Sequence, residues 1–112
     1  MSTINKLRKE EMEKPTKPIP GALDIPFLNE MSKVMAYGAA KYDRDNWKKA
    51  TVRQRIYYVD AAFRHLFAFL MGETKDKESG VHHLAHLACN IMFLYYFDRR
   101  EKNNGKKRLN NI

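Results

Sequence analysis

The chain has 112 residues, and its hydrophobic fraction of 44% is enough for one folded domain but not for two separate cores. The formal net charge is +8, and most of the excess lies in residues 1–20 and 98–112, where basic chain ends are usually solvated. This distribution disfavours nucleic acid as a partner, because binding it needs a basic patch on the folded part.

Cys89 is the only cysteine, which excludes an internal disulfide framework and fits a reducing compartment. The start of the chain is charged, unlike a signal peptide, and the longest apolar runs contain His or Arg, unlike a membrane span. We therefore expect a cytoplasmic protein that has no membrane partner.

Residues 1–20 are polar and contain Pro15, Pro18 and Pro20, a spacing that prevents a helix and favours extended backbone. We expect an arm that lies on its own or a neighbouring subunit, or that is disordered. Residues 21–100 are predicted to form a helical domain, and residues 101–112 a flexible basic tail.

The first of three predicted helices follows Asp24 and Pro26 and continues through Tyr42, since apolar residues recur there at helical spacing. Residues 43–47 break this spacing and are predicted to form a loop. Gly38 lies inside the helix, where it either allows close approach of a helix or ligand or is simply tolerated.

The second helix is predicted behind a capping box at Thr51 and Gln54, with Leu70 near its end and Gly72 as its C-terminal cap. Its apolar side is expected to face the core and consists of Ile56, Val59, Phe63, Leu66, Phe67 and Leu70.

The third helix is predicted from near Ser79 to about Tyr96 or Arg99. Its core stripe consists of Val81, Leu84, Ala85, Ala88, Ile91, Met92 and Tyr95. The predicted fold is therefore all-α, a small domain of about three main helices. Because a chain of this size buries only a modest core, we expect it to assemble as a homo-oligomer.

Three acidic residues, Glu73, Asp76 and Glu78, lie close together just before the third helix. Clustered carboxylates can bind Mg²⁺ or Mn²⁺, and Mg²⁺ usually keeps waters for substrate phosphates. We therefore predict a metal site at these residues, with Glu78 also a candidate catalytic group. The alternative is that Asp76 or Ser79 caps the helix and Glu78 complements its dipole.

His83 and His86 lie three positions apart and share a polar stripe with Ser79. A lone buried histidine is usually a core residue, but two on one stripe can orient phosphates, ligate a metal, or act as acid and base. We predict both as catalytic residues and Ser79 as a substrate contact, whereas His82 points elsewhere. A zinc site that includes Cys89 is a weaker alternative, because paired ligand spacing is absent.

Arg64 is placed either to bind a phosphate with two hydrogen bonds or to pair with Asp60 four residues earlier. His65 lies about 100° round the helix from Arg64, so one of the two is expected to face elsewhere. Both are candidate substrate-binding residues.

Trp47 either fills the core beneath its loop or stacks on the base of a ligand, because an aromatic face accepts any planar partner. Tyr42 and Asn46 are candidate substrate contacts beside it. Lys41 is a candidate phosphate contact, and the alternative is that it is only solvated.

Together these residues resemble a small phage and prophage family known as the dATP/dGTP diphosphohydrolase N-terminal domain. The resemblance covers about residues 20–97, and its main segments are 38–42 (GAAKY), 46–47 (NW), 64–66 (RHL), 72–80 (GETKDKESG) and 83–86 (HLAH). It implies a mostly helical, oligomeric protein that handles purine deoxynucleotides with chemistry related to MazG-type pyrophosphohydrolases.

Enzymes of the MazG type cut between the α- and β-phosphates with Mg²⁺, which acids on packed helices hold. They typically carry an EExxE motif on one helix and ExxD on the next. Here Glu73 and Asp76 have the ExxD spacing, whereas an EExxE motif is absent.

The first hypothesis is therefore a Mg²⁺-dependent pyrophosphohydrolase of (deoxy)purine nucleoside triphosphates. The second is a non-catalytic protein that sequesters a nucleotide or a nucleotide-derived immune signal, as a phage would use to blunt host defence. A basic module for nucleic acid is the third, and the charge distribution disfavours it.

Overall fold

The computed structural model describes residues 16–103, and this part of the chain is helical, with no β-structure beyond one isolated bridge. The all-α prediction is confirmed. Residues 1–15 of the predicted arm and 104–112 of the predicted tail lie outside the described residues. Residues 16–19 form exposed chain without regular structure and lead into a 3₁₀ turn, η1 (Pro20–Ala22).

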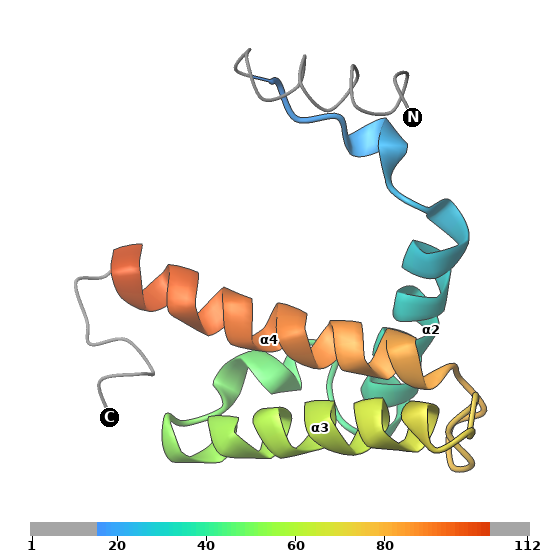
Figure 1. Cartoon of the computed structure of the whole chain (residues 1–112). Helices are drawn as coiled ribbons and strands as arrows, with labels where there is room; N and C mark the ends of the chain where they lie inside the picture. The colour runs from blue at the N-terminus through green and yellow to red at the C-terminus, as the bar shows by residue number, and fades with distance from the viewer. Residues whose placement is uncertain (1–15, 104–112) are drawn as a thin grey trace.

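Three α-helices make up the described fold: α2 (Ile25–Lys41), α3 (Ile56–Leu70) and α4 (His83–Asn103). Two 3₁₀ turns, η2 (Asn46–Lys49) and η3 (Arg53–Arg55), connect α2 to α3. Helices α3 and α4 run antiparallel side by side, and α2 packs against α4 (Figure 1). None of these helices is long and apolar enough to cross a lipid bilayer.

Helix α2 begins where the sequence predicts. A carboxylate oxygen of Asp24 accepts a hydrogen bond of 3.1 Å from the amide of Phe27, which satisfies one of the free N–H groups of the first turn. Pro26 lies in that turn, where its missing N–H is not needed. The helix ends at Lys41, and Tyr42 caps it.

The predicted caps of α3 are both present. The amide of Thr51 donates to Gln54 Oε1 at 2.9 Å, and the amide of Gln54 donates to Thr51 Oγ1 at 3.2 Å, as in a capping box. At the other end Gly72 has a φ of +99°, and the amide of Glu73 donates to the carbonyl of Ala68 at 2.9 Å. This pattern is a Schellman cap, and it needs a glycine at the left-handed position.

Helix α4 begins at His83, and the predicted start near Ser79 is wrong. The chain before it folds back on itself, because the amide of Asp76 donates to the carbonyl of Val81 at 2.9 Å. Gly80, with a φ of +74°, makes this turn possible. The resulting loop, residues 71–82, places its acidic residues beside the helices instead of in line with α4.

His82, rather than Asp76 or Ser79, caps α4, since its Nδ1 accepts a hydrogen bond of 3.0 Å from the amide of Leu84. At the other end α4 continues to Asn103, beyond the predicted limit at Arg99. The first residues of the predicted flexible tail are therefore helical.

Glu101 is part of a buried ion pair with Arg55, and both side chains are almost fully shielded from solvent. The guanidinium of Arg55 also lies 4.1 Å from the ring centre of Phe97. Because Arg55 directly precedes α3, the pair ties the start of α3 to the last turns of α4. Residues 101–103 therefore belong to α4, and the rest of the predicted tail lies outside the described residues.

The buried core lies where α2 meets the first half of α4. Its buried apolar residues are Val34, Val81, Ala85 and Cys89, against which Met31, Met35 and Phe93 pack. This cluster is small for a chain of this length, as expected from size alone.

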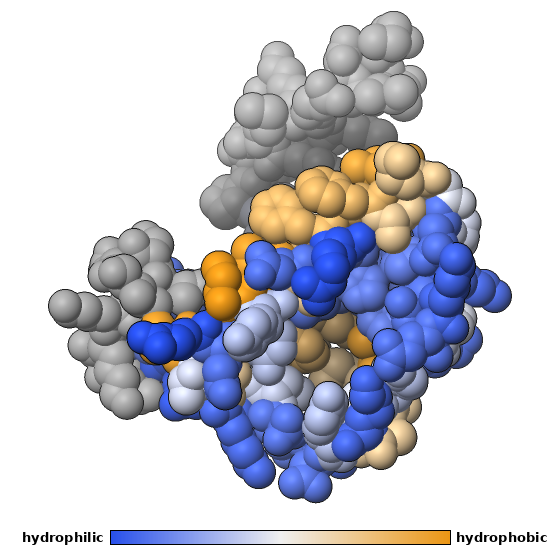
Figure 2. All heavy atoms as spheres, turned by 90° about the horizontal axis from the view of Figure 1, so that it is seen from below, coloured by the Kyte–Doolittle hydropathy of each residue, from blue (hydrophilic) through white to orange (hydrophobic). Residues whose placement is uncertain are grey.

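The predicted apolar side of α3 is only partly buried, since Val59 and Leu66 are half-buried and the other four residues are exposed. Its exposed members are Ile56, Phe63, Phe67 and Leu70. Ile91 and Tyr95 of the predicted α4 stripe are exposed as well. Helix α3 packs on α4, and Figure 2 shows a hydrophobic band along the upper edge of the face that it draws.

Candidate functional site

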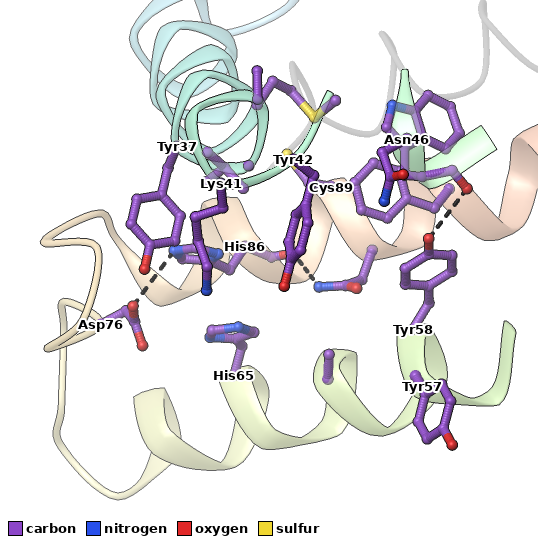
Figure 3. Close-up of a pocket in the computed structure, with 18 of the residues that line it drawn as sticks. Tyr37, Lys41, Tyr42, Asn46, Tyr57, Tyr58, His65, Asp76, His86 and Cys89 are labelled. Atoms are coloured by element: carbon purple, nitrogen blue, oxygen red, sulfur yellow. Dashed lines mark hydrogen bonds and ion pairs between the residues drawn. The ribbon is translucent and has the colours of Figure 1, made fainter. Parts of the chain in front are cut away.

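A pocket of about 510 Å³ opens between α2 and α3, with part of α4 as its floor. Figure 2 shows the hollow bordered by hydrophilic residues, and Figure 3 shows the side chains that line it. Gly38 lies on its wall, and a Cβ added there would meet no atom within 4 Å. The volume falls in the range of typical ligand pockets.

The α2 side of the pocket combines a cation with its counter-ion. Lys41 Nζ lies 3.0 Å from Glu78 Oε1, and the hydroxyl of Tyr37 donates to the same oxygen at 2.5 Å. The hydrogen bond from Tyr37, followed by that from Lys41, lowers the pKa of Glu78. The same contact raises the pKa of Lys41, so the ammonium stays charged at neutral pH.

Two further cations line the pocket: Arg44, on the loop after α2, and Arg64, on α3. Arg64 forms no ion pair with Asp60, contrary to that alternative. His65 also lines the pocket, so the expectation that one of the two neighbours faces elsewhere is wrong.

The aromatic side of the pocket has one ring packed against another aromatic residue and two rings that are mostly exposed. Trp47 stacks on Phe93 with ring centres 4.5 Å apart, and its carbonyl accepts a hydrogen bond of 3.1 Å from the hydroxyl of Tyr58. Tyr42 and Tyr57 line the pocket but stay 61% and 66% exposed. The geometry therefore supports the packing role of Trp47, and it leaves the two tyrosines available to contact a ligand.

Histidines from α3 and α4 meet at the other end of the pocket. His65 Nδ1 lies 2.8 Å from His83 Nδ1, and the rings of His65 and His86 stack with centres 4.4 Å apart (Figure 3 shows His65 and His86). Burial and the neighbouring His86 and His83 lower the pKa of His65 to about 4. Burial also lowers the pKa of His86. Both rings are consequently neutral at pH 7.

The loop before α4 supplies the carboxylates that hold these rings. Glu73 Oε1 lies 2.7 Å from His83 Nε2, and this hydrogen bond lowers the pKa of Glu73. Asp76 accepts hydrogen bonds of 2.8 Å from both the amide and the hydroxyl of Ser79. Burial acts to raise the pKa of Asp76, but these bonds outweigh it, and the pKa is lowered.

The hydroxyl of Ser79 also lies 2.7 Å from His86 Nε2. Ser79 therefore joins Asp76 to His86, and the loop, α3 and α4 form one hydrogen-bonded unit with the histidines at its centre. Glu73 contacts the ring of His83, and Ser79 contacts the ring of His86.

The three predicted metal ligands are not brought together. Glu73 contacts His83 and Lys77, Glu78 contacts Tyr37 and Lys41, and Asp76 contacts Ser79. Among residues 16–103, the acidic and histidine ligand atoms that do converge belong to His65, Asp76 and His83, within 4.8 Å of one another. Cys89 is not among them, and burial raises the pKa of its thiol to about 11.

Most of the residues predicted for the site line the pocket: Lys41, Tyr42, Asn46, Trp47, Arg64, His65, Asp76, Glu78 and His86. Glu73, Ser79 and His83 do not line the pocket. Ser79 and His83 contact the lining residues His86 and His65, and Glu73 contacts His83. Three further residues that line the pocket were not predicted from the sequence: Tyr37, Arg44 and Tyr57. Tyr37 had a usable signal, since it lies four residues before Lys41 on the same helix face.

Comparisons with known proteins agree with the resemblance seen in the sequence. The family described as dATP/dGTP diphosphohydrolase, N-terminal, matches residues 8–107. A protein of Salmonella phage PMBT28 named dATP/dGTP diphosphohydrolase is 34% identical over 74 residues, which is 66% of this chain and 24% of that protein. The chain thus spans about a quarter of the length of this relative. No solved structure gives a significant match.

The family match covers every helical element that the structure describes, including those that border the pocket. This chain therefore belongs to the dATP/dGTP diphosphohydrolase N-terminal family.

Proposed function

We propose that the pocket binds a purine deoxynucleoside triphosphate and that the protein hydrolyses it to the monophosphate and diphosphate. The observation that carries the proposal is one pocket that is lined both by cations and by exposed aromatic rings. A nucleotide presents the matching pair of features, a polyanion and a flat base. Family membership and the name of the phage relative point to the same substrate class.

The cations Lys41, Arg44 and Arg64 are proposed to bind the phosphates. Arginine binds phosphate oxygens with two parallel hydrogen bonds, and lysine adds a point charge. Lys41 already contacts Glu78, so a phosphate would compete with that carboxylate for the ammonium. Arg64 has no such partner in the described part of the chain and is the strongest candidate.

Tyr42 and Tyr57 are proposed to contact the base, since both rings are exposed at the pocket. Stacking on an aromatic ring tolerates any base, so this contact supplies affinity more than base identity. Trp47, which the sequence also offers for this role, is proposed to act mainly through packing, because one of its faces lies on Phe93.

His86 is proposed to accept the proton of the attacking water. Its ring lines the pocket and is neutral at pH 7, as a general base must be. His83 is only 3% exposed, so we propose that it positions His65 rather than meeting substrate. Glu78 is proposed to orient Lys41.

The Mg²⁺ or Mn²⁺ site expected at Glu73, Asp76 and Glu78 does not fit this arrangement, because each carboxylate has a different set of partners. Mg²⁺ requires near-octahedral oxygen ligands, and these three acids do not offer a common centre. We assign no step of the reaction to an ion held there, and the choice of divalent ion becomes a variable of the assay.

Self-association is proposed to cover the exposed apolar residues of α3. Few apolar side chains are fully buried in the described part of the chain, whereas Phe63 and Phe67 are more than half exposed. Burying such rings against a second copy would supplement the small core. Light scattering should give an oligomeric mass that Phe67→Glu reduces toward the monomer. A wild-type monomer at all concentrations would contradict this.

Incubation of the protein with each of the four dNTPs, with Mg²⁺ and separately with Mn²⁺, tests the function. We expect dAMP or dGMP and an equal amount of diphosphate from dATP or dGTP, resolved by ion-exchange chromatography. Unchanged dATP recovered only after heat release of a bound fraction would instead identify a sequestering protein. Absence of both turnover and bound nucleotide would overturn the proposal.

The matched variants are Arg64→Ala and Arg53→Ala. Arg53 is exposed on η3 and does not line the pocket. We expect Arg64→Ala to weaken dATP affinity by at least about tenfold, the typical effect of losing a charged hydrogen bond. Arg53→Ala should bind dATP like the wild type. Equal losses in both variants would argue for non-specific attraction of the anion.

A further inference from the structure

His65, His83 and Asp76 bring three potential metal-ligand atoms close together. The Nδ1 atoms of the two histidines face each other at 2.8 Å, and one oxygen of Asp76 completes a set within 4.8 Å. Each residue comes from a different element: α3, α4 and the loop between them. Such a convergence is not a product of local sequence.

The protonation of His83 follows from its other nitrogen. Its Nε2 lies 2.7 Å from Glu73 Oε1, and a carboxylate in that position accepts a hydrogen bond, so Nε2 carries the proton. The Nδ1 atom of this tautomer therefore presents a lone pair toward His65. A carboxylate behind a ligating histidine is also the usual arrangement that fixes the tautomer at metal centres.

We propose that His65, His83 and Asp76 bind a divalent first-row transition-metal ion, such as Fe²⁺, Co²⁺ or Zn²⁺. Two imidazole nitrogens and one carboxylate oxygen form the donor set of a 2-His-1-carboxylate site, which leaves further positions open. Imidazole favours these ions over Mg²⁺, which prefers oxygen ligands. The site replaces the three-carboxylate Mg²⁺ site expected from the sequence.

His65 and Asp76 line the pocket, so the bound ion would lie at its wall. Glu73 is a positioning residue in this scheme, since it reaches the ion only through His83. The inference does not depend on the proposed nucleotide, because the metal alone is the probe.

The test is a titration of the metal-stripped protein with Co²⁺, followed by its visible absorption. We expect saturation at one Co²⁺ per chain, no displacement by a hundredfold excess of Mg²⁺, and no intense near-ultraviolet band of a cobalt–thiolate bond. The same titration with His65→Ala should show at least about a hundredfold weaker binding, and Asp76→Asn should also weaken it.

Two further variants separate a metal site from a structural hydrogen-bond network. Glu73→Gln should lower Co²⁺ affinity by about 10-fold to 100-fold, the usual effect of removing a carboxylate behind a ligand. Glu78→Gln, an acid in the same loop with other partners, should leave Co²⁺ affinity unchanged. Circular dichroism of each variant checks that the helices are retained.

Absence of saturable Co²⁺ binding to the wild type would overturn the proposal, and so would displacement by equimolar Mg²⁺. These two results need no variant, so they count even if a substitution at His65 prevents folding. Unchanged Co²⁺ affinity in folded His65→Ala would likewise contradict it, and the short contact would then be a hydrogen bond between two imidazoles.

Discussion

The two ends of the α3–α4 pair are built in opposite ways. At one end the side chains pack: Trp47 stacks on Phe93, Phe97 is fully buried, and the Arg55–Glu101 pair is sealed from water. At the other end polar groups bond to one another around three histidines and border an open pocket. At the aromatic end, the polar groups form a buried ion pair that joins the helices. At the histidine end, titratable groups line a pocket that a ligand can enter.

This difference separates what stabilises the chain from what we propose that it does. Imidazoles add little hydrophobic stabilisation, and each needs a hydrogen-bond partner that a leucine would not need. Substitutions at the aromatic end should therefore lower stability. Substitutions at the histidine end should change ligand or metal binding instead.

The largest expected effect is that of Glu101→Ala, which leaves the buried guanidinium of Arg55 without its counter-ion. Removing one partner of a buried pair usually costs about 3–5 kcal/mol. Urea unfolding followed by circular dichroism measures it. Glu30→Ala, which breaks a partly exposed pair with Lys33, is the control and should lower the free energy of unfolding by less than about 1 kcal/mol. Equal free energies of unfolding for the two variants would contradict the stabilising role of the buried pair.

The next effect contrasts two aromatic residues of the same pocket wall. Trp47→Ala should lower the free energy of unfolding by about 3 kcal/mol, the lower end for a packed tryptophan, because its ring is only half-buried. Tyr42→Ala should leave unfolding unchanged and weaken dATP binding by about tenfold, since its exposed ring is free to stack on a base. The reverse pattern would assign the base contact to Trp47.

The smallest effect is expected from Glu78→Gln. Removing this charge frees Lys41 and lowers repulsion of the phosphates, so dATP affinity should rise by roughly twofold to fivefold in calorimetry. Asp60→Asn on α3, away from the pocket lining, should not change it. Weaker binding of Mg²⁺–dATP by Glu78→Gln would instead support the metal role that the sequence suggested for Glu78.

The sequence predicts the helices well where the signals are local. The capping box at Thr51, the Asp24 cap and the Gly72 terminus all depend on residues within four or five positions of each other, and all three occur. The start of α4 is predicted wrongly because it does not depend on local signals alone. Helical spacing continues back toward Ser79, whereas the fold of the loop depends on Gly80 and on backbone bonds across it.

Contacts between distant residues could not be predicted from spacing. Arg55 and Glu101 are 46 positions apart, and nothing in either neighbourhood marks them as a pair. The sequence gathers the histidines and acids in one region, but it does not say which of them converge. It grouped Asp76 with Glu73 and Glu78, whereas the structure groups it with His65 and His83.

The most direct test of the account is an amide ¹H–¹⁵N spectrum of the protein titrated with dATP. We predict shifts that saturate and are concentrated in Lys41, Tyr42, Arg64 and His65, while the amides around Arg55 and Glu101 stay unchanged. Shifts concentrated at the aromatic end, or no saturable shift at all, would contradict the assignment of the nucleotide to this pocket.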